Sequence, residues 1–509
     1  MFTHPETLSQ LKREIKMPVP KNYFEGHPLK IGNETQLLID DFIIEDRWAL
    51  NRVIHNPTKH PLNPILVKDK PWEGDIVTAA HVLWDDDFDC YRMWYKCFSE
   101  ANYWGAGGPP YHLSYAESKD GINWEKPMME VSDYPGYPKS NVVYTGTYRK
   151  RTQGVQVIKN ENAKDPGRRY MLVHVEAIPH TELGLQSGVN VAYSPDGLRW
   201  TLPEPPEHIL DYHSDCYNHV VYDPVEELWL LYCRPIEMFS SGRRDLREGQ
   251  AGARHMRRRV SVMTSKDFVN WSYPRTCMYP DEIDTPDYDS CTVFRYGGRF
   301  IMLYAAMEGD VTGSNEIRIA TSSDGFNWER LPAREPYLPR GREGDWDAGQ
   351  VLIGGPPVIQ GDEMLIYYNG TPNPQYETTT QSGIAVAIAK VDRFVEQRAY
   401  DRPGYLLTRE FILEGNRLKV NTVMPGKPYH EQLMRVEIAR HPPLGGQHGF
   451  SQPYPGFSFE DSDVLKGSRT DMIVTWGGKS DLSDLIGKPV YLRFELRNMG
   501  LFSFQTIKV

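Results

Sequence analysis

The chain has 509 residues, of which 57 are Lys or Arg and 68 are Asp or Glu, giving a formal net charge of −11. This acidic balance argues against a general nucleic-acid binder, which needs a basic face for the phosphates. The apolar runs are far shorter than the ~20 residues that span a bilayer, so no membrane helix is expected. With 40% hydrophobic and 25% charged residues, the chain has the composition of a globular protein.

The composition also indicates the class of fold. Aromatic residues reach 12%, and the chain contains 42 Gly and 39 Pro. Tyr and Trp favour strands, while Gly and Pro favour turns, so we expect many short strands joined by tight turns. The N-terminus lacks the apolar core of a signal peptide, which predicts a cytoplasmic protein, although a secreted chain trimmed of its leader would look the same. The six cysteines form no C-x2-C pair and are expected to be reduced.

The first predicted element is a strand over QLLIDDFIIED (residues 36–46). After it, one phrase that combines a strand, a tight turn and an aromatic residue recurs along the chain. Its four clear copies are AESKDGINW, AYSPDGLRW, MTSKDFVNW and ATSSDGFNW, ending at Trp124, Trp200, Trp271 and Trp328. A degenerate fifth copy, AIAKVDRFV, has Phe394 in place of Trp. Because an aromatic-aliphatic strand and a polar turn precede each copy, each unit is a meander of about four strands.

Five such units between residues 70 and 400 predict a five-bladed β-propeller, and a sandwich whose strands share a turn motif is the disfavoured alternative. Residues 36–46 are expected to close the ring with the last blade, since closure removes exposed strand edges. Beyond about residue 405 the phrase disappears, and period-two alternation predicts an antiparallel sandwich. The all-β chain is therefore expected to comprise an N-terminal extension (1–35), a five-bladed propeller (36–405) and a C-terminal β-sandwich (406–509).

Acidic residues lie at the start of the innermost strands, which converge on the axis where propellers bind ligands. They are Glu73 and Asp75 in the first unit, Asp215 in the third, Asp284, Asp287 and Asp289 in the fourth, and Asp345 and Asp347 in the fifth. The second strands of the second and fourth units end at Glu176 and Glu308. A single Asp at such a place can equally cap a turn, but the set favours acid/base chemistry in one axial pocket.

Other residues near these acids have candidate roles. Tyr288 and Trp346 can stack on sugar rings, with blade packing as the equal alternative. The H-x2-C-x2-H segment that begins at His213 does not predict a metal site, because residues along one strand alternate faces; a hydrogen bond from His213 to substrate is favoured. Seven arginines crowd residues 240–259. That segment is interpreted as a solvated loop or subunit contact, or else as a loop that binds a carboxylate or phosphate.

The chain resembles the five-bladed propeller glycosidases, the group that contains families 32, 43, 68, 117 and 130. The segment EGDWDAGQVLIGGPPVIQGDEMLIYYNG (residues 343–370) is similar to the last-blade signature of family 130. Residues 37–66 and 474–505 are similar to the opening and tail of bacterial proteins described as family 32-like. At the level of architecture the resemblance covers nearly the whole chain.

In those families three carboxylates from separate blades act as base or nucleophile, stabiliser and general acid. The resemblance implies catalytic roles for Asp75, Asp215 and Asp287. Its alternatives for the acid are Glu176, Glu237 and Glu308. The chain departs from the pattern in the second unit, where Gln153 cannot replace the stabiliser that the family places there.

We therefore expect a glycoside hydrolase that cleaves an oligosaccharide or a glycan terminus in the axial pocket. A family 130-like phosphorylase, in which Arg234 holds phosphate, and a sugar-binding propeller without catalysis stay open. The expected partner is a carbohydrate, without nucleic acid, membrane, metal or cofactor, and a homo-oligomer is left open. The residues expected to bind substrate are Glu73, Glu176, His213, Arg234, Tyr288, Glu308, Trp346 and Asp347.

Overall fold

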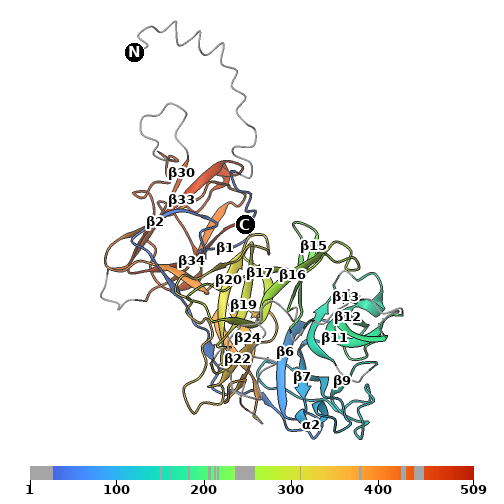
Figure 1. The fold of residues 1–509 in the computed structure, drawn as a ribbon. Coiled ribbons are helices and arrows are strands. Elements are labelled where there is room, and N and C mark those ends of the chain that lie inside the picture. Colours follow the sequence, from blue (N-terminus) through green and yellow to red (C-terminus); the bar gives the residue numbers. More distant parts are fainter. Residues whose placement is uncertain are drawn as a thin grey trace, which may run out of the picture. The chain divides into compact units, whose positions relative to one another are not determined.

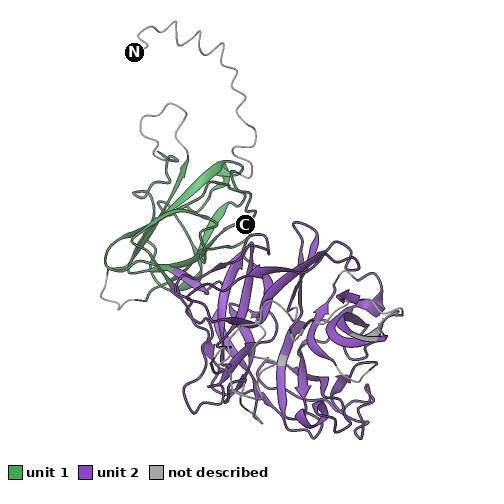
Figure 2. Cartoon of the chain, viewed as in Figure 1, with its two compact units in different colours: residues 1–52, 397–509 green, residues 53–396 purple. Residues whose placement is uncertain are grey.

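The computed structural model describes residues 27–148, 152–161, 163–180, 184–204, 208–210, 214, 217–234, 258–309, 311–375, 377, 381–425, 431–440 and 452–509. The described part is nearly all strand, which confirms the all-β prediction; its helical segments are α2 (Glu100–Tyr103), η1 (Pro166–Arg168) and η2 (Ser483–Leu485). Within it, no helix is long and apolar enough to cross a membrane. The chain forms two compact units, unit 1 (residues 1–52 and 397–509) and unit 2 (residues 53–396) (Figure 2).

Three sheets of unit 2 are antiparallel meanders of four strands in chain order (Figure 1). The first consists of β6 (Ile76–Asp85), β7 (Cys90–Phe98), β8 (Tyr111–Ser118) and β9 (Val142–Tyr144). The second consists of β10 (Gln153–Lys159), β11 (Tyr170–His180), β12 (Gly184–Ser194) and β13 (His208–Leu210). The third consists of β14 (His219–Asp223), β15 (Leu228–Cys233), β16 (Val260–Ser265) and β17 (Arg275–Met278).

A ten-stranded sheet holds a fourth and a fifth meander, joined by a parallel pairing of Asn315 with Gln350. The fourth consists of β18 (Asp287–Tyr296), β19 (Arg299–Met307), β20 (Asn315–Ser322) and β21 (Glu329–Arg330). The fifth consists of β22 (Gln350–Ile353), β24 (Glu363–Thr371) and β25 (Gly383–Lys390), with β23 (Val358–Gln360) on β24 and with β4 (Thr58–Lys59) and β5 (Leu66–Val67) on β25.

The extra strands on the fifth meander thus come from residues 58–67, and the expectation that residues 36–46 supply them is wrong. Within that segment β1 (Gln36–Leu37) pairs with β34 (Gly500–Ile507) and β2 (Ile44–Trp48) pairs with β27 (Gly404–Thr408). Both partners belong to unit 1. An apolar pattern identifies a strand but not the strand with which it pairs. The prediction therefore assigned residues 36–46 to the wrong sheet.

Buried side chains connect neighbouring meanders, except that the fourth and fifth are joined by the backbone pairing of Asn315 with Gln350. The connecting clusters include Trp94 with Leu172, Val173 with Leu231, Tyr232 with Met302, and Tyr95 with Tyr367. The last pair joins the fifth meander to the first, so the sheets of unit 2 close on themselves, as blades of a propeller do. The count of five blades around one axis stays a prediction.

The repeated phrase forms the same turn in four meanders. In the first copy Asp120 accepts hydrogen bonds from the backbone N–H groups of Ile122 and Asn123 at 2.9 and 2.8 Å, and Trp124 donates its indole N–H to the carbonyl of Gly121 at 3.1 Å. The same backbone bonds are accepted by Asp196, Asp267 and Asp324. Such side-chain bonds stabilise turns. We call the edge where these turns lie the turn edge, and the opposite edge, where each first strand begins, the mouth edge.

Unit 1 consists of two sheets. One has the order β3 (Asn51–Ile54), β26 (Val395–Arg398), β34, β29 (Arg417–Val423) and β32 (Arg469–Ile473), with β1 on β34. The other has the order β2, β27, β33 (Pro489–Arg497), β30 (Leu433–Arg440) and β31 (Gln452–Pro453), with β28 (Phe411–Ile412) on β33. Leu418 and Phe504 of the first sheet share a buried cluster with Val436 and Phe494 of the second, so the two sheets pack face to face as a sandwich.

Candidate active site at the mouth edge

The first strands of the meanders meet through buried polar side chains. The rings of His81 (β6) and His219 (β14) stack with their centroids 6.1 Å apart. Thr292 (β18) and Gln156 (β10) place polar atoms 2.8 and 3.3 Å from Nε2 of His219. A Cβ on Gly355, which follows β22, would lie 2.9 Å from the His81 ring. Side chains therefore fill the centre between these strands, and a ligand site has to lie at one end of it.

Burial keeps these histidines uncharged. Loss of hydration lowers the pKa of His81 to about 4, and burial together with the repulsion that a protonated His81 would exert lowers the pKa of His219 well below its usual value. Neither ring nitrogen of His81 has a hydrogen-bond partner among the described residues. The centre is thus polar and neutral near pH 7.

Asp75 lies at the mouth edge of the first meander, directly before β6. Its backbone N–H donates to the carbonyl of Phe98 at 2.7 Å, and its Oδ2 accepts a hydrogen bond of 2.7 Å from the backbone N–H of Glu100, the first residue of α2. Asp75 is half-buried, and its Oδ1 has no partner within the part of the chain that the structure describes. In the structure, Asp75, which the sequence singled out, is a carboxylate with one oxygen held by a hydrogen bond and the other oxygen open.

The fourth meander begins with a cluster of acidic and basic side chains. Asp287, at the start of β18, is 3% exposed, and its Oδ1 accepts a hydrogen bond of 2.7 Å from the backbone N–H of Arg258. Nη1 of Arg259 lies 3.9 Å from the same oxygen. Asp289 forms ion pairs with Arg234 at 2.8 Å and with Arg258 at 3.4 Å. The predicted residues Asp287 and Arg234 thus lie in one group that holds three guanidinium groups.

Glu308 follows β19 on the same edge. Asp287 pairs with Met307 across the β18–β19 ladder, so Glu308 comes directly after the residue opposite Asp287. Its neighbour Gly309 packs so closely that a Cβ there would meet Oδ2 of Asp287 at 1.9 Å. The Glu308 side chain itself is exposed, and in the described ranges no hydrogen bond or ion pair engages it. A buried and an exposed carboxylate therefore adjoin at this edge.

Two other predicted carboxylates are saturated by protein groups. Glu73 is fully buried, and its oxygens accept hydrogen bonds from the Tyr95 hydroxyl and the Lys126 ammonium group, both at 2.6 Å, and from two backbone N–H groups. Glu176 is 1% exposed and accepts from the Tyr144 hydroxyl at 2.9 Å and from backbone N–H groups of the adjacent loop. These contacts fit structural roles, and we leave both residues out of the proposed site.

The two aromatic residues that the sequence singled out, Tyr288 and Trp346, differ in how far their rings are exposed. Tyr288 is 1% exposed, packs on Tyr304 at 5.2 Å and accepts a hydrogen bond of 2.6 Å from Arg330, so its ring is not available for stacking on a sugar. Trp346 is half-buried and lies over Tyr368, with centroids 6.0 Å apart and planes inclined by 26°. Part of the Trp346 surface thus stays exposed, unlike that of Tyr288.

Trp346 borders a small pocket at the mouth edge of the fifth meander. The pocket has a volume of about 230 Å³, and its lining includes Pro64, Lys68, Trp346, Gln381 and Ser382. The next residue, Asp347, is buried and is held by Lys59 at 2.6 Å and by the Tyr368 hydroxyl at 3.2 Å. Sequence reasoning missed Lys59, because no local signal links it to an aspartate so distant in the chain. Asp347 therefore fixes the loop that presents Trp346.

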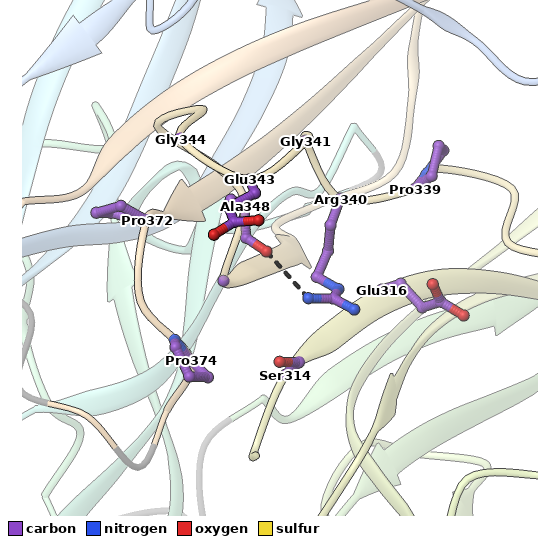
Figure 3. A pocket seen from close by; sticks show the side chains of 11 residues that line it. Ser314, Glu316, Pro339, Arg340, Gly341, Glu343, Gly344, Ala348, Pro372 and Pro374 are labelled. Atoms are coloured by element: carbon purple, nitrogen blue, oxygen red, sulfur yellow. Dashed lines mark hydrogen bonds between the residues drawn. The ribbon is translucent and has the colours of Figure 1, made fainter.

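Other residues of the same loop line a larger pocket of about 550 Å³ (Figure 3). Its lining includes Ser314, Glu316, Arg340, Glu343, Pro372 and Pro374. Nη1 of Arg340 donates to the carbonyl of Ala348 at 3.0 Å, which holds the guanidinium group at the end of the loop. Ser314 and Glu316 mark the start of β20 and Pro372 follows β24, so this pocket also belongs to the mouth edge.

Three of the residues that the sequence singled out lie outside the described residues. They are Asp215, His213 and Glu237, and the arginine-rich segment 240–259 is described only at Arg258 and Arg259. Ser214, between two of these positions, accepts a hydrogen bond of 3.1 Å from the backbone N–H of Arg234. Asp215 stays a prediction.

No protein-family model and no curated protein matches the sequence, but solved structures do. The chain is similar to an N-acetylgalactosamine deacetylase from F. plautii, with 16% identity, a TM-score of 0.44, and coverage of 68% of this chain and 97% of that one. A second similar structure comes from work on GH130-family glycoside hydrolases that target β-1,2 mannosidic linkages in Candida mannan. It has 14% identity and a TM-score of 0.44, and the match covers 69% of this chain and 96% of that one. A thermostable family-43 glycoside hydrolase has 14% identity, a TM-score of 0.41, and coverage of 65% and 96%.

Proposed function

We propose that this chain is a glycoside hydrolase whose acid/base chemistry takes place at the mouth edge of unit 2. The observation that carries the proposal is that two carboxylates on this edge are open: Oδ1 of Asp75 and the whole carboxylate of Glu308 have no partner among the described residues. Hydrolysis of a glycosidic bond needs one carboxyl group that protonates the leaving oxygen and a second that acts as base or nucleophile. The neighbouring Glu73 and Glu176 are saturated, so they do not compete for these roles.

Each carboxylate suits a different role. Asp75 is oriented by the backbone N–H of Glu100, so we assign it the base or nucleophile role, with Oδ1 directed to water or to the sugar carbon. Glu308 is exposed and can follow a leaving oxygen, so we assign it the acid role. Asp287 is buried beside Arg258 and Arg259, and we assign it the role of stabiliser. Asp215 remains a further catalytic candidate.

The test is turnover of a panel of 4-nitrophenyl glycosides and plant and fungal polysaccharides by the whole chain. Loss of a general acid or base typically lowers the rate 10²–10⁴-fold, so D75N and E308Q are each expected to lower kcat by about that factor with an unchanged melting temperature. Glu226→Gln, an exposed carboxylate in a loop between β14 and β15 at the turn edge, is the control and should retain full activity. Full activity in both variants would refute the assignment, and binding of glycans without turnover would favour a sugar-binding protein.

A phosphorylase is the second candidate, and the arginines near Asp287 favour it. Arg234, Arg258 and Arg259 supply three guanidinium groups against the two carboxylates of Asp287 and Asp289. Guanidinium groups match phosphate oxygens in geometry and charge. Turnover measured with and without inorganic phosphate separates the two functions: a phosphorylase releases a sugar phosphate and requires phosphate, whereas a hydrolase is indifferent to it.

A further inference from the structure

Aromatic residues gather in the loop that joins β7 to β8, and the sequence reasoning did not single them out. We call residues 98–111 the aromatic arm. Its rings are in mutual contact: the centroid of Phe98 lies 4.9 Å from that of Tyr111, and the centroid of Tyr103 lies 5.9 Å from that of Phe98 and 5.1 Å from that of Trp104. The ammonium group of Lys96 lies 5.5 Å from the centre of the Tyr111 ring. The arm is therefore an organised aromatic cluster.

The aromatic arm lies at the mouth edge, beside Asp75. Ile76 pairs with Phe98 in the β6–β7 ladder, so the chain leaves β7 next to the point at which it enters β6. Oδ2 of Asp75 accepts a hydrogen bond from the backbone N–H of Glu100, which opens α2 within the arm. Ser99 caps the same helix by accepting a hydrogen bond from the N–H of Asn102. One carboxylate thus connects the arm to the proposed site.

Trp104 presents its indole to solvent at the end of this arm. Its side chain is 77% exposed, and among the described residues no acceptor lies within hydrogen-bond distance of its indole N–H. Trp84, on the same sheet but near the turn edge, provides a contrast: it is 37% exposed, donates its indole N–H to Asp86 at 2.8 Å and packs edge-on against Tyr91. Trp84 is thus explained by its own surroundings, whereas Trp104 is not.

We propose that Trp104, supported by Tyr103, is a stacking surface for a pyranose ring of the glycan bound at Asp75. This inference rests on the proposed function and deepens it, since it places a sugar-binding position on the first meander. The C–H face of a sugar ring covers an exposed indole face, while the ring hydroxyls stay available to hydrogen-bond donors and acceptors. Because Glu100 binds Asp75, a sugar held on the arm lies next to the carboxylate that acts on it.

Affinity electrophoresis in native gels that contain mannan, xylan, arabinan or levan tests this proposal without requiring turnover. The wild-type chain is expected to be retarded by at least one of these polysaccharides. Trp104→Ala should weaken that retardation about tenfold, since removal of a central aromatic contact commonly has an effect of this size. Tyr103→Ala should weaken it less, and Trp84→Ala, the matched control, should leave it unchanged. Because Trp104 is exposed, its variant should melt at the wild-type temperature.

Each outcome bears on the proposal. Equal retardation of Trp104→Ala and the wild type would overturn it, as would equal losses in Trp104→Ala and Trp84→Ala, or a wild-type chain that no gel retards. A dimer that dissociates in Trp104→Ala, measured by size-exclusion chromatography, would show that a second copy of the chain covers this surface and would also overturn it. Retardation through Trp104 without turnover would refute hydrolysis alone, and turnover with binding independent of Trp104 would refute this inference alone.

Discussion

The turn edge and the mouth edge of unit 2 are formed by the same strands, yet their side chains follow different rules. At the turn edge Asp120 and its counterparts Asp196, Asp267 and Asp324 make nearly the same backbone hydrogen bonds in four meanders. At the mouth edge Glu73 is saturated by its neighbours, while Asp75, two residues later, keeps one oxygen open. A contact repeated from meander to meander serves the fold, so the unrepeated and unsatisfied groups are the ones we propose for a ligand.

The turn edge also joins neighbouring meanders. A ring on the second strand of one meander donates a hydrogen bond to the turn of the next. The donors are Trp94, Tyr232 and Tyr367, and their acceptors are the carbonyls of Gly197, Gly325 and Gly121, at 2.7, 2.8 and 2.9 Å. The repeated phrase therefore stabilises the contacts between sheets as well as its own turns. Substitutions at this edge should cost stability, and substitutions at the mouth edge should cost activity.

The largest effect on stability is expected from Asp85→Asn at the turn edge. Asp85 is fully buried and binds Arg92 of the first meander at 2.9 Å, together with Lys159 at 2.7 Å and the Tyr170 hydroxyl at 2.6 Å of the second. Removing its charge leaves the buried Arg92 without its partner, which typically costs ~3–5 kcal/mol. Urea unfolding should show this loss, with turnover per folded molecule unchanged.

A matched control is Glu130→Gln, which removes a surface ion pair with Lys139 in which both side chains are 67% exposed. An exposed pair contributes about 0–1 kcal/mol, so the unfolding midpoint should barely move. If Asp85→Asn lowered turnover while leaving stability intact, the division between the two edges would be wrong.

Acid is expected to destabilise the centre that lies between the two edges. Burial holds the pKa of His81 at about 4, whereas an unfolded histidine takes up its proton near pH 6.5. Between these values the unfolded state binds more protons, so the free energy of unfolding falls as the pH falls from 6.5 to 4, by about 3 kcal/mol for His81. Urea unfolding at pH 7 and 4.5 measures this fall in the free energy of unfolding, and the fall should be smaller in His81→Asn. An equal fall in the variant and the wild type would contradict the role given to His81.

The sequence predicted the turn edge better than the rest of the fold. The phrase that ends at Trp124 is local, because Asp120 binds backbone groups two and three residues ahead, and local patterns are visible in a sequence. The prediction of a partner for the strand over residues 36–46 was wrong because its real partners are remote in the chain: Leu37 pairs with Ser503. Partner choice over that separation depends on tertiary packing, which alternation alone does not encode.

The candidate site was predicted by position but not by surroundings. Carboxylates were expected at strand starts, and Asp75 and Asp287 are there. What distinguishes an open carboxylate from a saturated one is supplied by distant residues, as Lys126 does for Glu73. Trp104 follows β7 and does not precede a first strand, so the position of strand starts does not point to it, although it is an aromatic residue in a glycine-rich loop.

The smallest expected effect compares two glycines of the second meander and isolates the packing of its turn edge against the first meander. Gly197 at the turn edge and Gly184 at the mouth edge have nearly equal positive φ values of 73° and 72°, so alanine strains both backbones alike. A Cβ at Gly197 would lie 2.9 Å from the Trp94 ring, whereas at Gly184 no described atom lies within 4 Å. Gly197→Ala should therefore cost ~1–2 kcal/mol more than Gly184→Ala, since overpacking adds to the shared strain. Equal melting temperatures would mean that the Trp94 contact yields freely, and the turn edge would then differ from the mouth edge in hydrogen bonding alone.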